Sequence, residues 1–166
     1  MQDSKPFPEP KPIWGARALL FERLVDDQHE SQEEARPLRI HDIDALRESV
    51  KREVTRLLNT RRPHRETSHE GDELTVLDYG IPDFSHLEAA STTDRQNLAA
   101  ILVKSIAAFE PRLTQVEVSL NPAPGNPTRL VGRINAMLEV DSVKEPVSFP
   151  LTIGIESGET TILESE

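Results

Sequence analysis

The sequence predicts an α+β fold in which two amphipathic helices pack on one face of a three- or four-stranded antiparallel meander. The chain has 166 residues, the size of one domain with polar ends. Apolar residues recur at three- and four-residue steps over residues 42–58 and 94–109, and then at every second residue over three later segments. Because an antiparallel sheet with one apolar face needs helices over that face, the two amphipathic segments complete the core.

The first helix is predicted from about Asp42 to Leu58. Its apolar residues form one stripe along the helix: Ile43, Leu46, Val50, Val54, Leu57 and Leu58. Asp42 is a favourable N-cap, and Asn59 is suited to a left-handed residue at the end of the helix. Pro63 then prevents any continuation.

The second helix is predicted from about Asp94 to Phe109. Thr93 and Gln96 have the spacing of a capping box at its start. Pro111 ends the helix, because the residue before a proline is pushed out of the α region.

The segment between the helices is expected to contain a short strand at residues 74–77, followed by a turn. Residues 78–83 combine glycine, proline and aspartate, which is typical of turns. We expect a structural turn built from Tyr79, Gly80, Pro82 and Asp83.

Alternating apolar residues predict three consecutive strands near 116–120, 130–140 and 147–155. Such a meander leaves two edges, and we expect either 129–140 or 147–155 to be an incomplete edge. Pro146 and Pro150 bracket the second of these strands and would guard it against unwanted pairing.

The predicted organisation is a flexible proline-rich arm at 1–17, a domain at 18–163 and an acidic tail at 164–166. Prolines alternate with other residues over 6–12, which favours an extended path. Trp14 follows this stretch, either as an anchor in a partner or as a lid on the protein's own core.

Composition excludes several classes of protein. The formal net charge of −10 argues against nucleic-acid binding, which needs a basic footprint. The chain has no long apolar run that could insert into a membrane and no pattern of a signal peptide at its start, and the lack of cysteine fits the cytoplasm.

Residues 39–65 are locally basic, with eight basic and four acidic residues. This segment is either a solvated helix face or a surface for an acidic protein partner.

Catalytic and metal sites are not predicted, and neither is a cofactor. His64 and His69 lie close together in a loop, but a zinc site needs three or four converging ligands. Paired carboxylates are the one enzymatic alternative, a muramidase-like peptidoglycan hydrolase that would use Glu110 with Asp78 or Asp83. With one Trp and one Tyr, the chain is poor in the aromatic residues that stack on sugars.

Glu110, Pro111 and Arg112 form the most specific motif. The proline fixes the backbone between the second helix and the first long strand, so an acid and a guanidinium project from a rigid corner. Two interpretations remain open at this point. Glu110 and Arg112 either close a local ion pair that staples the junction, or they bind a partner.

The chain resembles the TssE family, small baseplate subunits of bacterial type VI secretion systems, which are similar to the lysozyme-like wedge protein of contractile phage baseplates. Four segments carry the resemblance, in the order of the family: 20–24 (Leu-Phe-Glu-Arg-Leu), 57–61 (Leu-Leu-Asn-Thr-Arg), 78–83 (Asp-Tyr-Gly-Ile-Pro-Asp), and 109–113 (Phe-Glu-Pro-Arg-Leu). Together they span about residues 18–155.

The resemblance implies a non-enzymatic structural subunit in the cytoplasm, assembled at the inner face of the cell envelope. In this family the corner contacts the core bundle of the wedge proteins TssF and TssG, and TssK joins through the wedge. It thus implies partner binding by Glu110, Pro111 and Arg112. The resemblance also implies a platform on which the sheath proteins TssB and TssC begin to polymerise, with an edge strand that the first sheath ring extends. We expect the acidic residues around 139–159 to favour a basic incoming strand.

Overall fold

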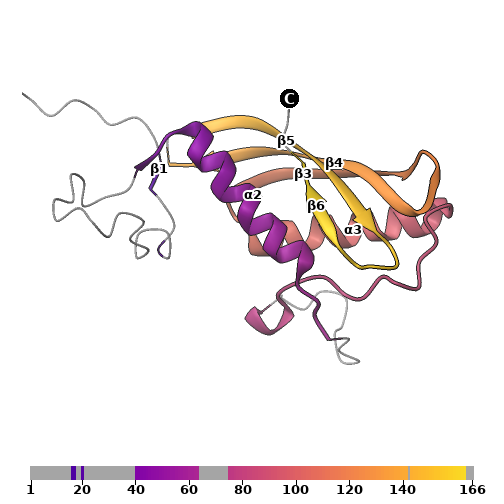
Figure 1. The fold of residues 1–166 in the computed structure, drawn as a ribbon. Coiled ribbons are helices and arrows are strands. Elements are labelled where there is room, and N and C mark those ends of the chain that lie inside the picture. The colour runs from indigo at the N-terminus through magenta and orange to yellow at the C-terminus, as the bar shows by residue number, and fades with distance from the viewer. Residues whose placement is uncertain (1–15, 18–19, 21–39, 64–74, 142, 164–166) are drawn as a thin grey trace, which may run out of the picture.

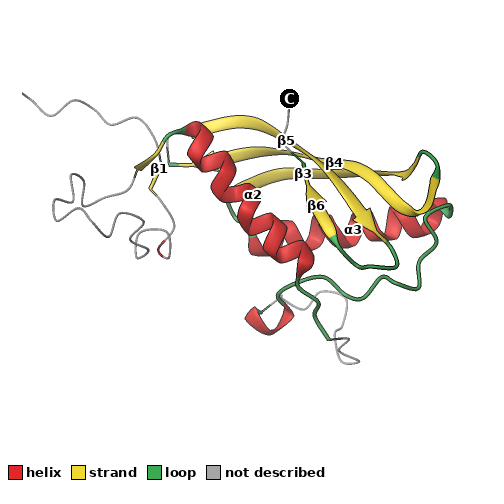
Figure 2. Cartoon of the chain, in the orientation of Figure 1, coloured by secondary structure: helices red, strands yellow, loops and turns green. Residues whose placement is uncertain are grey.

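The computed structural model describes residues 16–17, 20, 40–63, 75–141 and 143–163 (Figure 1). The helices of this part of the chain are α2 (Ile43–Asn59) and α3 (Thr92–Phe109), with a 3₁₀ turn, η1 (Val76–Asp78), between them. The strands that follow are β3 (Leu113–Ala123), β4 (Asn126–Val140), β5 (Val143–Gly154) and β6 (Thr160–Ile162). They form one antiparallel sheet in the order β3-β4-β5-β6 (Figure 2). The predicted α+β fold is therefore confirmed.

The core lies between the two helices and one face of the sheet. The side chains of β4 and β5 that point to this face are buried: Leu130, Ile134, Ala136 and Leu138 in β4, and Val147, Phe149, Leu151 and Ile153 in β5. The helices cover them with the residues that the periodicity predicts: Leu46, Val50, Val54, Leu57 and Leu58 in α2, and Leu98, Leu102 and Ile106 in α3. Ile101 and Phe109 pack at the margin of this cluster.

Helix α2 begins as predicted but ends differently. Asp42 caps the helix by accepting a 2.9 Å hydrogen bond from the amide of Ala45. The prediction that Asn59 is a left-handed stop is wrong, because Asn59 is the last helical residue and the extended Thr60 follows it. The Asn59 amide instead exchanges bonds of 2.8 and 2.9 Å with the backbone of Thr160, which joins α2 to β6.

Helix α3 begins two residues earlier than predicted. The hydroxyl of Ser91 accepts a 3.2 Å hydrogen bond from the amide of Asp94, so Ser91 is the N-cap. Thr93 already lies in the first turn, and the predicted capping box of Thr93 and Gln96 is wrong.

The strand expected at 74–77 is also wrong. Residues 76–78 form η1, and Thr75 and Asp78 make a capping box across it. The Asp78 carboxylate accepts from the backbone amide of Thr75 at 2.9 Å and from its hydroxyl at 2.8 Å. These local bonds satisfy the backbone where a strand would need a neighbouring strand.

The sheet order corrects the prediction about its edges. β4 pairs with β3 on one side and β5 on the other, so 129–140 is not an edge. β5 pairs with β4 over its whole length, but with β6 only at Leu151–Ile153. Among the described residues, the first half of β5 is therefore paired on one side alone.

The ends of the chain lie largely outside this description. Residues 1–15, which include Trp14, and the tail at 164–166 are outside the described residues, as are His64 and His69. Ala16–Arg17 form a short antiparallel ladder, β1, with Ile40–His41, β2, directly before α2.

Candidate functional site

The corner at Pro111 lies between the end of α3 and the start of β3. Glu110 is the C-cap of α3, and its backbone carbonyl accepts a 3.0 Å hydrogen bond from the amide of Leu113. The carbonyl of Arg112 accepts from the amide of Glu139 at 2.8 Å, which anchors the corner to β4. The backbone is thus fixed on both sides of Pro111, and Pro111 itself is exposed.

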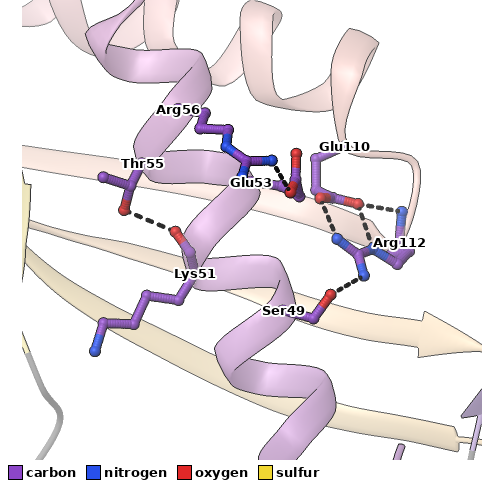
Figure 3. A network of polar contacts seen from close by, with 7 residues as sticks. All are labelled: Ser49, Lys51, Glu53, Thr55, Arg56, Glu110 and Arg112. Carbon is purple, nitrogen blue, oxygen red and sulfur yellow. Dashed lines mark hydrogen bonds and ion pairs between the residues drawn. The ribbon is translucent and has the colours of Figure 1, made fainter. Parts of the chain in front are cut away.

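Glu110 and Arg112 close a buried ion pair (Figure 3). The distances are 2.7 Å from Arg112 Nε to Glu110 Oε1 and 2.7 Å from Nη2 to Oε2. The third nitrogen, Nη1, donates to the hydroxyl of Ser49 in α2 at 2.8 Å. Exposure is 4% for Glu110 and 8% for Arg112, so the guanidinium is committed to its own chain. Of the two interpretations of the motif, the local ion pair is the one present in the isolated protein.

A pocket of about 150 Å³ adjoins the corner. Its walls are mainly apolar, and they come from α2, α3 and the turn after η1. The lining residues are Glu53, Leu57, Tyr79, Phe109, Glu110, Pro111 and Arg112. The size suits one aliphatic side chain, so the rigid corner and the pocket together form a small concave contact surface.

Tyr79 forms one wall of this pocket. Its ring meets that of Phe109 edge to face, with centroids 5.3 Å apart and an interplanar angle of 68°. Burial raises the pKa of Tyr79 above its usual value, and the carboxylates of Glu53 and Glu110 raise it further, against the opposing charge of Arg56. The hydroxyl of Tyr79 therefore loses its proton at a higher pH than an ordinary tyrosine does.

The segment 79–83 forms a tight turn against the end of α2. Gly80 has a φ of +106°, and a Cβ atom there would lie 2.5 Å from the carbonyl oxygen of Thr60. The next residue, Ile81, donates to that same oxygen at 2.9 Å. Pro82 is half-buried, and the exposed Asp83 accepts from the amide and hydroxyl of Ser85 at 3.0 and 2.9 Å. These hydrogen bonds lower the pKa of Asp83.

A second concave surface lies between α2 and the first half of β5. This groove has a volume of about 440 Å³. Its lining residues are Asp44, Arg47, Glu48 and Lys51 of α2, Pro146, Val147, Ser148 and Phe149 of β5, and Leu163 just after β6. The groove therefore runs along the part of β5 that β6 does not cover.

Comparison with known proteins identifies the family. Residues 44–143 match the family model of the baseplate wedge protein gp25. This match covers more than half of the chain and includes α2, the turn, α3 and the corner. The chain belongs to the gp25 baseplate wedge family. The family predicted from the sequence motifs is thereby confirmed.

The gp25-family chain is also similar to a solved structure titled "The baseplate complex from the type VI secretion system". The similarity covers 74% of this chain and 97% of that chain, with 16% sequence identity and a TM-score of 0.46. No curated protein matches the sequence.

The contacts of Arg61 were not predicted from the sequence. Arg61 lies over the ring of Phe84, 4.6 Å from its centroid. Its guanidinium donates to the carbonyl of Leu58 at 2.9 Å and to the carbonyl of Gly158 in the β5–β6 loop. Burial lowers the pKa of Arg61, partly offset by Asp83. Arg61 ends the segment 57–61 that carries the resemblance and directly follows a helix, but neither signal indicates these distant contacts.

The carboxylates of the enzymatic alternative each have a local structural role. Glu110 pairs with Arg112, Asp78 caps η1, and Asp83 closes the bend at Ser85. In the described residues no group of three His, Asp or Glu side chains could hold a metal ion. No helix in the same part of the chain is long and apolar enough to span a membrane.

The described part of the basic segment, residues 40–63, forms ion pairs along the exposed face of α2. Arg47 pairs with Asp44 at 3.4 Å, and Lys51 pairs with Glu48 at 3.6 Å. Arg47 also contacts Glu145 of β5. These pairs fit a solvated helix face for Arg47 and Lys51, and the surface for an acidic partner stays a prediction.

Proposed function

We propose that this gp25-family chain is a non-enzymatic structural subunit of a type VI secretion baseplate that links the wedge to the contractile sheath. The family match carries the general role, and two concave surfaces, the corner pocket and the α2–β5 groove, support the linking role. The subunit is proposed to work in the cytoplasm, at the inner face of the cell envelope.

The corner is proposed as the contact for the wedge proteins TssF and TssG, with TssK reached through the wedge. Glu110, Pro111 and Arg112 act together but differently. Pro111 is exposed and touches the partner beside the pocket of Tyr79 and Phe109, whereas Glu110 and Arg112 are buried and fix the direction in which Pro111 points. An exposed proline on a fixed backbone loses little conformational entropy when it binds, which favours association.

The α2–β5 groove is proposed as the place where the sheath proteins TssB and TssC add a strand. The unpaired half of β5 offers main-chain groups to an incoming strand, and β3 is the other edge of the sheet. The α2–β5 groove lies beside this half of β5 and has room for the side chains of an added strand. This feature favours β5 over β3.

Charge near this edge favours a basic incoming strand. Glu139 pairs with Lys144 at 2.5 Å, and Glu145 contacts Arg47, so these two carboxylates contribute less to the attraction. The remaining acidic residues of this region, Asp141, Glu156 and Glu159, still favour a basic strand, and the contact is expected to weaken with salt.

Affinity purification from the native cell tests the proposed function. The tagged protein is expected to bring down TssF and TssG, and TssB and TssC when the sheath is assembled. A matched purification of the Pro111→Glu variant is expected to lose the wedge proteins. Purification of the folded wild-type protein without any wedge or sheath protein would contradict the proposal.

A further inference from the structure

In the unpaired half of β5, the positions of the prolines determine which main-chain N–H groups are available to a partner strand. Pro150 accepts a 2.8 Å hydrogen bond from the amide of Leu163, and Gly154 donates to Glu159 at 2.9 Å. Even-numbered residues of β5 therefore direct their backbone groups toward β6. The same alternation directs the groups of Lys144, Pro146 and Ser148 to that side, where no described residue pairs with them.

Five of the six main-chain groups at these three positions can form hydrogen bonds. Each residue has a carbonyl, but Pro146 has no N–H. A partner strand therefore donates to all three carbonyls and accepts from two amides. The strand needs an N–H at each facing position, so it cannot have proline there. Its residue opposite Val147 points to the same face as Val147, into the groove between β5 and α2, and an aliphatic side chain suits that position.

A second copy of this chain is a poorer occupant of the same edge. In a symmetric antiparallel pair, each copy contributes a Pro146 that lacks a donor, so two bonds are lost, whereas a partner strand without proline loses one. When the pair is centred on Pro146, the two Pro146 residues face each other. When it is centred on Val147, each Pro146 faces Ser148, whose carbonyl then lacks a donor. When it is centred on Ser148, each Pro146 faces a Pro150, whose carbonyl already accepts from Leu163. Every arrangement therefore loses at least two bonds.

We infer that Pro146 is a specificity residue that makes the α2–β5 groove select a partner strand over a second copy of this chain. The inference rests on the proposed strand addition and names what the groove accepts: an extended segment of another protein, antiparallel to β5, in line with β6. It has an aliphatic residue opposite Val147 and no proline opposite Lys144, Pro146 or Ser148.

Self-association of the purified full chain tests this inference. Pro146→Thr restores the missing N–H on both copies, and Pro146 is exposed, so the substitution leaves the core untouched. By sedimentation equilibrium, this variant is expected to dimerise at least roughly tenfold more tightly than the wild type, because a net main-chain hydrogen bond corresponds to about a tenfold change in affinity. Pro146→Ala, which restores the same N–H, is expected to behave alike.

Two further variants make the test specific. Adding Ser148→Pro to Pro146→Thr removes an amide from the same edge and is expected to return dimerisation to the wild-type level. Pro122→Thr changes an exposed proline in β3, the other edge strand, and is expected to leave dimerisation unchanged. Unchanged self-association of both Pro146 variants, persistence of the dimer with Ser148→Pro, or an equal effect of Pro122→Thr would each overturn the inference.

The outcome is separable from that of the proposed function. Binding of TssB and TssC by the wild-type protein tests strand addition, and it does not depend on any Pro146 variant. If that binding occurs, the Pro146→Thr dimer is expected to compete with it, so less sheath protein binds as the concentration of the variant rises. Equal binding by a dimeric Pro146→Thr variant at all concentrations would place the sheath strand elsewhere and refute the role assigned to Pro146.

Discussion

Arg112 holds Glu110 in a two-pronged ion pair with both N···O distances at 2.7 Å, and the residue between them, Pro111, is exposed. In this tripeptide the side chains of Glu110 and Arg112 thus point into the protein, and the side chain of Pro111 points outward. The charges complete the structure of the corner, and the proline is the part that a partner can reach.

Arg112→Ala is expected to destabilise the isolated protein. The substitution leaves the buried Glu110 carboxylate without its counter-charge and removes the donor to Ser49, and breaking a buried pair in this way costs about 3–5 kcal/mol. Urea denaturation measures the loss. Ser49→Ala is the control, because it removes one neutral acceptor and is expected to cost about 1–3 kcal/mol. An Arg112→Ala variant as stable as the wild type would show that the pair contributes nothing to the fold.

Pro111→Glu is expected to abolish binding of TssF and TssG without changing the melting temperature. The side chain is exposed, so a charge there is tolerated by the fold but disfavoured against an apolar partner surface. The matched control is Pro124→Glu, which changes an exposed proline in the β3–β4 hairpin. Pull-down with purified wedge proteins checks both variants. Normal binding by Pro111→Glu would remove the corner from the wedge interface.

Gly80→Ala is expected to destabilise the turn more than Gly125→Ala destabilises the β3–β4 hairpin. Both glycines have positive φ, at +106° and +72°, so both substitutions incur a backbone cost of about 1–2 kcal/mol. At Gly80 the new Cβ would also lie 2.5 Å from the Thr60 carbonyl oxygen, whereas nothing lies within 4 Å at Gly125. Thermal melting of the two variants separates the steric contribution from the backbone contribution, and equal melting temperatures would argue against the clash.

Tyr79 is expected to make stability fall with rising pH in alkaline solution. Its pKa in the folded state is raised above the usual 10.0, chiefly by burial. As the pH rises past 10.0, the unfolded chain releases this proton while the folded chain still holds it, so the free energy of unfolding decreases up to the folded pKa. Tyr79→Phe is expected to show a smaller decrease over this window in urea titrations, and identical slopes would contradict the assignment.

Periodicity was enough to predict the helices, three of the strands and the buried face of the sheet, because burial repeats every 3.6 or 2 residues. It could not predict β6, since Thr160–Ile162 is too short to show alternation. The start of α3 depended on whether Ser91 or Thr93 is the N-cap. Both residue types are favourable N-caps, and the spacing of the apolar residues does not distinguish them. The ion pair of the corner was one of two interpretations open from the sequence, but its third hydrogen bond could not be predicted, because Ser49 lies far away in sequence and meets Arg112 only in the folded chain.

Ser148→Pro is expected to block assembly of TssB and TssC while leaving the fold and the binding of TssF and TssG intact. Ser148 lies between Pro146 and Pro150 in β5, and alternation directs its N–H to the groove rather than to β4. β5 already contains prolines at two positions of this orientation, so a third removes a donor to the incoming strand without breaking the ladder with β4. Arg133→Pro is the contrasting variant. Arg133 lies in the middle of β4, which pairs with a strand on both sides. Proline at this position removes an N–H that takes part in the ladder, so the variant is expected to unfold the sheet. Circular dichroism checks the fold, and electron microscopy of sheaths grown on purified baseplates checks assembly. Normal sheaths on baseplates that contain folded Ser148→Pro protein would exclude β5 as the acceptor and leave β3 as the edge to test.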